Sequence, residues 1–277
     1  MALTKIPASM LADTFATQTY VDAALAAGST AKPLNSQAFT ATGTWTKPTG
    51  YGASAIAVIE AWGAGASGGK GNAALGGGGG GYSVKTVLLS ALGATETVTI
   101  GAGGVARTAN SVGAAGGNST FGTQLTGYGA SGAYAGGPLG AASTNSPGLP
   151  KLVSEISLTT DLAFTYQGGP GVNVGQVYFD SPSTERHGGG GGAHFGVNTG
   201  NGGSSIFGGG GGGGIYVNGQ AFGAGGTSLH AGAGTLATNT TTATAGAQPG
   251  GGGGATYTGT SGAGGAGRVI VRVFDGA

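Results

Sequence analysis

The stretch FGGGGGGGIYVNGQAFGAGG, residues 207–226, has seven consecutive glycines followed by a short run that contains Ile215, Tyr216 and Phe222. Glycine loses more backbone freedom on folding than any other residue, and it costs roughly 0.5–1 kcal/mol relative to alanine in regular structure. The chain has 68 glycines among its 277 residues, which makes the entropic cost on the order of tens of kcal/mol. A folded structure must offset this cost with a large and regular set of interactions.

The other glycine runs indicate what those interactions are. They lie at residues 76–81, 188–192 and 250–254. None keeps the strict Gly-X-Y period of collagen, and aromatic residues are interleaved with them, unlike in flexible Gly/Ser linkers. Polyproline II helices of glycine can pack side by side and join their N–H and C=O groups, each bond adding about 0.5–1.5 kcal/mol. We therefore predict a domain of packed polyglycine II helices in which the glycines are the core.

Composition excludes several classes of protein. Only 7% of the residues are charged, the net charge is +1 and cysteine is absent, whereas about 25% of the residues in typical soluble proteins are charged. A nucleic-acid-binding protein needs a basic stripe that neutralises phosphates, so nucleic acid is not an expected partner. No segment reaches the ~20 apolar residues of a spanning helix, and the N-terminus lacks a signal-peptide core. We expect synthesis in a cytoplasm and no membrane insertion.

The rest of the chain is typical of a mainly β and irregular fold with one short helix at the N-terminus. In the segment 267–274, Val269, Val271 and Val273 alternate with Ile270, Arg272 and Phe274, the period of a strand with one buried face. Strands are also predicted over residues 53–62, 82–93 and 95–104, and from Phe39 up to a turn at residues 48–50. This indicates a small β-structure, a strand frame over about 39–104 and 267–275, and a glycine-rich lattice with loops over about 105–266.

The first 35 residues differ from the rest. In ATQTYVDAALAAG, residues 16–28, the residues Tyr20, Val21, Ala24 and Leu25 form an apolar stripe of helical spacing. A helix this short is marginal alone. Its stripe packs either on the chain's own core or on another copy or another protein. We therefore interpret residues 1–35 as an attachment or oligomerisation segment with a linker, and residues 36–277 as the glycine-rich domain.

The order of the blocks along the chain resembles a known family. FTATGTWTKPTGY, IAVIEAWGAGASGG, GGGGGGYSVKTVLL, TVTIGAGG, GGNSTFG and GGAGRVIVRVF are similar to the glycine-rich domain of bacteriophage tail-fibre and receptor-binding proteins. The resemblance implies β-structure at the ends of the domain, a polyglycine II lattice in the middle, and variable loops that touch the host surface. It also implies a homotrimer on a virion and no catalytic motif. Two glycine-poor inserts, residues 151–167 and 172–187, are either additional strands or binding loops.

Other motifs point only weakly to chemistry. Gly63, Gly65 and Gly68 have the spacing of a dinucleotide fingerprint, but no helix or suitably placed acid follows. His187, His194 and His230 are too few and too widely spaced to specify a metal site, so neither metal nor cofactor is expected.

Four scarce acids could belong to a glycan-cleaving site, but their spacing fixes no carboxylate pair. They are Glu155, Asp161, Asp180 and Glu185. A depolymerase is therefore the weakest alternative, and we expect no enzyme.

Candidate binding residues gather in YFDSPSTERHGGGGGAHF, residues 178–195. Planar rings and bidentate groups suit contact with a sugar face or a protein loop. The predicted receptor-binding residues are Tyr178, Phe179, Asp180, Arg186, His187 and His194, with Tyr166, Tyr216, Phe222 and His230 as further contacts. The same rings could instead pack over the glycine lattice. Two functions follow: a phage adhesin that binds a host glycan or outer-membrane protein, or a structural virion fibre or decoration protein without specific receptor binding.

Overall fold

The computed structural model describes residues 34–72, 74–130, 162–166, 200–215 and 222–275. In this part of the chain the fold consists of strands and irregular segments, and its helical structure is a single 3-10 turn, Leu89–Ala91. The predicted mainly β and irregular fold is thus confirmed for the described residues. The N-terminal helix predicted over residues 16–28, with Tyr20, Val21, Ala24 and Leu25, lies outside them.

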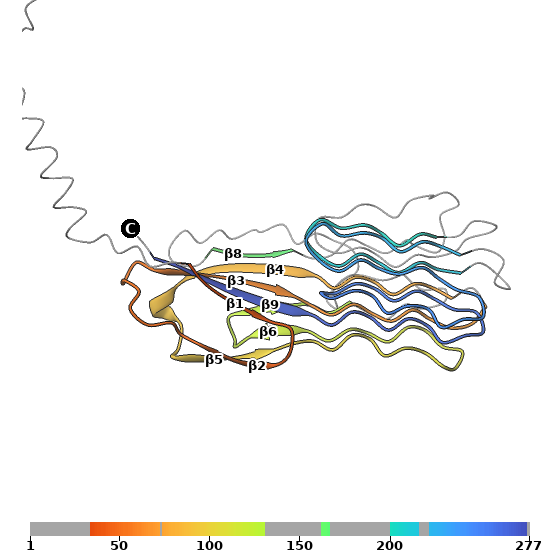
Figure 1. The fold of residues 1–277 in the computed structure, drawn as a ribbon, viewed down its shortest axis with the longest axis horizontal. Coiled ribbons are helices and arrows are strands. Elements are labelled where there is room, and N and C mark those ends of the chain that lie inside the picture. The colour runs from red at the N-terminus through yellow and green to blue at the C-terminus, as the bar shows by residue number, and fades with distance from the viewer. Residues whose placement is uncertain (1–33, 73, 131–161, 167–199, 216–221, 276–277) are drawn as a thin grey trace, which may run out of the picture.

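The strands form two antiparallel sheets (Figure 1). The five-stranded sheet has the order β1 (Asn35–Phe39), β9 (Arg268–Phe274), β3 (Ile56–Trp62), β4 (Tyr82–Leu88) and β8 (Leu162–Tyr166). The four-stranded sheet has the order β2 (Gly43–Thr46), β5 (Thr95–Thr99), β6 (Ser119–Phe121) and β7 (Leu125–Gly127). The first and last strands of the domain pair with each other, because β1 lies beside β9 with Asn35 opposite Val273.

The predicted strands correspond to β3, β4, β5 and β9, with ends that differ by a few residues. The segment predicted as strand from Phe39 to the turn at residues 48–50 is divided, because bends at residues 40–42 carry the chain from β1 in one sheet to β2 in the other. Three strands also lie within residues 105–266: β6, β7 and β8. Of the two glycine-poor inserts, the one at residues 151–167 contributes β8.

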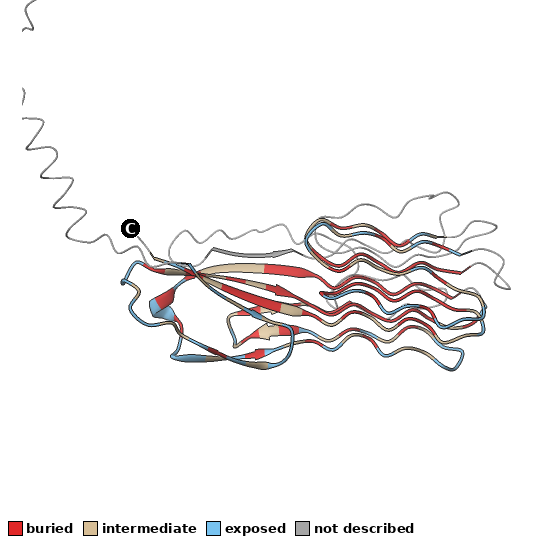
Figure 2. Cartoon of the chain, in the orientation of Figure 1, coloured by how far each residue is buried: buried red, intermediate tan, exposed pale blue. Residues whose placement is uncertain are grey.

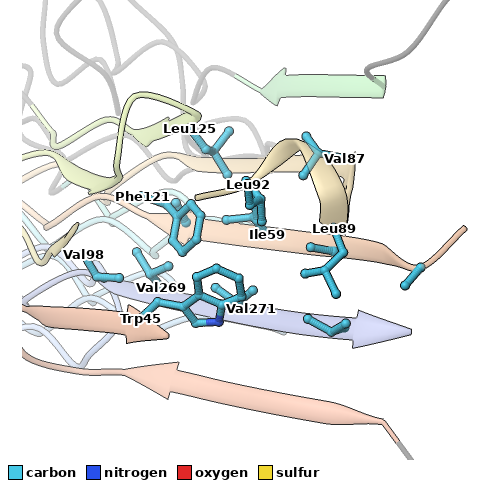
Figure 3. Close-up of a cluster of buried hydrophobic side chains, with 14 residues drawn as sticks. Trp45, Ile59, Val87, Leu89, Leu92, Val98, Phe121, Leu125, Val269 and Val271 are labelled. Atoms are coloured by element: carbon cyan, nitrogen blue, oxygen red, sulfur yellow. The ribbon is translucent and has the colours of Figure 1, made fainter. Parts of the chain in front are cut away.

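A hydrophobic core fills the space between the two sheets (Figure 3). Val269, Val271 and Val273 of β9 are fully buried in this core, as the period-two pattern predicts. Ile270 is also buried, in a second cluster with Trp62 and Tyr82, so the other face of the strand is not fully exposed as the pattern predicted. Trp45 and Phe121, from the four-stranded sheet, meet edge to face with ring centroids 5.4 Å apart. The sheets therefore pack as a sandwich, with buried side chains from both sheets in the core.

The glycine segments continue from the strands along the long axis of the molecule (Figure 1). In residues 63–70, successive backbone N–H groups bond to three different neighbouring segments in rotation. Gly63, Ala66 and Gly69 donate to the carbonyls of Gly81, Gly78 and Leu75, respectively. Ala64, Ser67 and Lys70 donate in the same way to Gly117, Ala114 and Ser111. Gly65 and Gly68 donate to Gly265 and Gly262, and all of these N···O distances are 2.8–3.0 Å. N–H groups three residues apart thus bond to the same neighbouring segment. We call these segments, residues 63–72, 74–81, 100–118, 128–130, 200–215 and 222–267, the glycine array.

The central run of the array repeats this rotation. Among residues 208–215, Gly209 and Gly212 donate to Gly80 and Gly77, Gly210 and Gly213 to Gly232 and Thr235, and Gly211 and Gly214 to Gly203 and Gly200. A repeat of three residues is that of the polyproline II conformation. The runs at residues 76–81, 208–214 and 250–254 are buried throughout, as the red segments of Figure 2 show. The array therefore has a core of backbone, held by hydrogen bonds instead of by large side chains.

The chain passes through the array in alternating directions. It turns near the sandwich at residues 205–207, 228–231 and 248–249, and it turns at the far end at residues 70–72, 107–111, 238–241 and 256–259 (Figure 1). We call the four far turns the distal tip. The opposite end of the sandwich, with the loops at residues 46–53 and 89–95, is the base. β1 begins and β9 ends at the base.

Candidate functional site

The structure separates the two predicted contact residues whose side chains it describes. Phe222 is 37% exposed and its backbone bridges Ile215, whose N–H donates to Ala74 O in the segment that leaves the distal tip. His230 lies in a turn at the other end of the array, beside the sandwich. These two residues therefore do not share one binding surface.

The other predicted residues are placed as follows. Tyr166 ends β8, where its backbone lies opposite Tyr82 of β4. Tyr178, Phe179, Asp180, Arg186, His187, His194 and Tyr216 lie outside the described residues.

His230 belongs to a row of rings at the junction of sandwich and array. Its imidazole stacks on Phe207 at 5.2 Å between centroids, and Phe207 stacks on Tyr82 at 5.4 Å. Tyr82 in turn contacts Trp62 at 5.0 Å, and Trp62 Nε1 donates a 2.7 Å hydrogen bond to Phe207 O. Trp62 and Tyr82 are buried. The row fastens the turn at residues 205–207 to the five-stranded sheet, which is a packing role.

Charged groups at the ends of this row are also engaged. The Arg268 guanidinium lies 4.6 Å above the Trp62 ring, and its burial lowers the pKa of Arg268 from the ordinary value. The Glu60 carboxylate accepts a 2.8 Å hydrogen bond from Tyr82 Oη and a second from Arg272. The Glu60 carboxylate is thus hydrogen-bonded from two sides, whereas Arg268 Nε is buried without a hydrogen-bond partner among the described residues.

The distal tip is a second and more accessible cluster of polar residues. Backbone bridges join its turns, pairing Lys70 with Ser111 and with Thr256, and Thr238 with Thr256. Asn72, Asn110, Ser111, Thr240, Thr241 and Thr258 are exposed there. Beneath them Ala74, Ile215, Ala237 and Ala255 form a small buried cluster. The backbone bridges and this buried cluster hold the four turns in fixed positions. The exposed polar side chains are therefore held in a defined arrangement.

Two cations hold carbonyl groups of the turn at residues 107–111 and its continuation. Lys70 Nζ donates to Thr108 O at 2.8 Å, and Arg107 Nε donates to Val112 O at 2.8 Å. The described carboxylates, Glu60, Glu96 and Asp275, all belong to the sandwich or its C-terminal end. The described part of the distal tip is therefore positively charged.

A cavity of about 300 Å³ opens between the turns at 70–72 and 107–111. Its lining includes Lys70, Asn72, Leu75, Asn110, Ser111 and Val112. Sequence reasoning did not select any of these residues. The available signal was the pair of polar interruptions GGKGN and RTANS within glycine-rich surroundings, but nothing in either one indicates that the other lies beside it.

A larger cavity of about 660 Å³ lies at the base, between the loops at residues 46–53 and 89–95. Lys47, Pro48, Tyr51 and Leu89 are among its lining residues. The Asp275 carboxylate, at the end of the described chain, accepts a 3.1 Å hydrogen bond from Gly52 N beside it. This cavity is thus close to where the domain begins and ends.

Neither a metal centre nor a membrane-spanning helix is found within the described ranges. No three His, Cys, Asp or Glu residues of that part of the chain are grouped so that they could hold a metal ion. Likewise, none of its helices has the length and hydropathy needed to span a bilayer.

Comparison with known proteins places the domain in a family. Residues 38–274 match the family model described as a glycine-rich domain, whereas no curated protein matches the chain. The match extends from β1 to the last residue of β9 and so includes both the sandwich and the array. On this evidence, the chain belongs to the glycine-rich domain family.

Proposed function

We propose that this protein is a bacteriophage fibre or adhesin that attaches the virion to a receptor on the host-cell surface. The receptor is a glycan or an outer-membrane protein. The observation that carries the proposal is the convergence of four polar turns at the end of the array farthest from the sandwich. The block order resembles that of phage receptor-binding proteins, and membership of the glycine-rich domain family is consistent with it.

The array is, in this proposal, a lattice of polyglycine II helices that acts as a stiff scaffold. The three-residue rotation of hydrogen bonds supports it, because each helix of this kind offers donors in three directions. Because the core of these helices is backbone, residues in the turns can be substituted without altering it. Such a scaffold is suited to presenting loops to a surface, since binding residues are commonly held on loops above a rigid framework.

The opposite end of the molecule faces the particle in this proposal. β1 starts at the base, so residues 1–33 join the domain there. Tyr20, Val21, Ala24 and Leu25 would make contacts with other virion proteins or with two further copies in a homotrimer. The base cavity of about 660 Å³ lies near the same end. In this orientation the base is attached to the virion and the distal tip points to the host.

Selective blocking of the two ends tests the proposal. The chain has no cysteine, so Thr240→Cys at the tip and Ala53→Cys at the base each give one site for polyethylene glycol maleimide. Both residues are exposed. Fluorescently labelled full-length protein is then applied to a panel of bacterial strains. We expect the polymer to abolish cell binding at position 240 and to leave it unchanged at position 53.

Two results would count against attachment through the tip. Equal binding by both conjugates would place the contact elsewhere on the molecule. Absence of binding to every strain, by unmodified protein shown to be folded, would favour the structural fibre or decoration protein instead.

A further inference from the structure

The cavity at the distal tip has the size and lining of a site for one sugar residue. At about 300 Å³ it lies at the lower end of the range for small-molecule pockets, roughly 300–1,000 Å³. Two turns that are far apart in the sequence form it, with lining residues 69–72, 74–75 and 110–112. Backbone pairing between Lys70 and Ser111 fixes these turns against each other. The pocket is therefore formed by the folded array and by neither turn alone.

Polar and apolar groups are mixed on its wall. Asn72 and Asn110 supply amides that can both donate to and accept from hydroxyl groups, and Ser111 supplies a hydroxyl. Leu75 and Val112 supply apolar surface. A sugar ring has this same combination of hydroxyl edges and C–H faces.

The cations at the pocket favour a sugar that carries a negative charge. Lys70 lines the pocket and carries an ammonium group with three donors, one of which bonds to Thr108 O. The Arg107 guanidinium bonds to the carbonyl of Val112, itself a lining residue. Within the described ranges, the carboxylates Glu60, Glu96 and Asp275 belong to the sandwich end of the molecule. An anion in the pocket therefore meets one lining cation, Lys70, with Arg107 nearby on the same turn as Asn110, and no described acid at the tip.

We propose that this pocket binds an acidic sugar residue, one that carries a carboxylate or a phosphate, of a host-surface glycan. The inference rests on the proposed attachment function and adds the chemistry of the receptor group. Lys70 neutralises the anion, Arg107 contributes positive potential from the adjoining turn, and Asn72 and Asn110 bond to ring hydroxyls. Ser111 and the apolar wall complete the contact.

The test measures binding of small sugars to the purified full-length chain by saturation-transfer difference NMR. The probes are methyl β-D-glucuronide, glucose 6-phosphate and the neutral methyl β-D-glucoside. We expect the protein to bind at least one charged sugar, to bind the neutral one more weakly, and to lose affinity as salt is raised, because salt screens exposed charges. The charged sugar that binds identifies the anion.

Substitutions at Lys70 test whether its ammonium group binds the anionic group of the sugar. Lys70→Gln removes the ammonium group, whereas Lys70→Arg keeps a cation at the same position. We expect affinity to fall about fivefold in the first variant and to stay near the wild-type value in the second. Lys47→Gln, at the base, is the matched control and leaves affinity unchanged. Thermal unfolding of each variant reports whether it is folded.

Three outcomes would overturn the inference: neither charged sugar binds, the neutral sugar binds as well as the charged ones, or folded Lys70→Gln binds like the wild type. The sugar comparison uses the wild-type protein and holds even if a variant does not fold. Failure here combined with tip-dependent cell binding would leave the attachment function intact and reject only the acidic sugar. Loss of tip-dependent cell binding would reject the function itself.

Discussion

Gly212 of the central glycine run faces the backbone of Gly253, so that a Cβ added to Gly212 would overlap the Gly253 carbonyl oxygen. Gly209, three residues earlier, has the same relation to Gly250. The spacing of three matches the rotation of the hydrogen bonds. Glycine is required at these positions because the backbones of neighbouring segments are in direct contact, and no side chain fits between them.

The first prediction concerns this contact. Gly212→Ala forces two backbone segments apart, and overpacking of this kind costs about 1–3 kcal/mol or more. We expect the free energy of unfolding to fall by at least about 2 kcal/mol, which corresponds to a decrease in Tm of about 4–8 °C in a domain of this size. Chemical denaturation and calorimetry measure both quantities.

Gly43→Ala is the control for the loss of a glycine. A Cβ at Gly43 would lie 3.7 Å from the ring of Phe39, an ordinary van der Waals contact. We expect its stability to change by less than about 1 kcal/mol. Equal stability of the two variants would contradict close packing of the array.

The second prediction concerns the sandwich core. Val271 is fully buried, whereas Val105 is 72% exposed. Val271→Ala deletes buried methyl groups and leaves a cavity, so we expect a loss of about 1–3 kcal/mol. Val105→Ala removes the same atoms from an exposed position and should change stability by no more than about 0.5 kcal/mol. Denaturant unfolding of the pair checks the assignment, and a larger effect at Val105 would contradict it.

The third prediction separates packing from binding at the junction. His230 stacks on Phe207 and lies at the end of the array opposite the tip. His230→Ala should reduce stability by about 0.5–1.5 kcal/mol, the typical value of an aromatic pair, and leave cell binding unchanged. A titration of labelled protein on cells measures the second effect. Loss of binding with unchanged stability would restore His230 as a receptor contact.

The fourth prediction concerns residues 178–187, which contain Tyr178, Phe179, Asp180, Arg186 and His187. Replacing this segment by a glycine-serine loop of equal length removes its rings and charges. We expect weaker cell binding without loss of stability, because these residue types suit contact with a receptor. The melting temperature and the cell-binding isotherm are measured on the same preparation. Unchanged binding would exclude this segment from the receptor contact.

The sequence predicts the strands better than it predicts their connections. β9 is recognisable because its valines alternate over seven residues, whereas β6 and β7 have three residues each and too little pattern to detect. The partners of each glycine run are harder still to assign. Identical residues carry no register information, so turn lengths and the turn residues decide which carbonyl meets which N–H.

The site shows the same limit. Lys70 and Asn110 are 40 positions apart in the sequence, and each alone is an ordinary turn residue. They line one cavity because two array segments pair through Lys70 and Ser111. Conversely, Phe222 and His230 are close in sequence but lie at opposite ends of the array, because the chain runs its full length between them. The sequence shows which polar and aromatic residues could bind a ligand, but which of them lie together depends on how the array folds.

Attachment through the distal tip is the central claim, and oriented beads test it most directly. Full-length protein is coupled to beads through Ala53→Cys at the base or through Thr240→Cys at the tip, at equal density, and bacteria are counted on each. We predict that cells adhere to beads with free tips and not to beads coupled through the tip. Equal adhesion to both, or adhesion only to the tip-coupled beads, would contradict it.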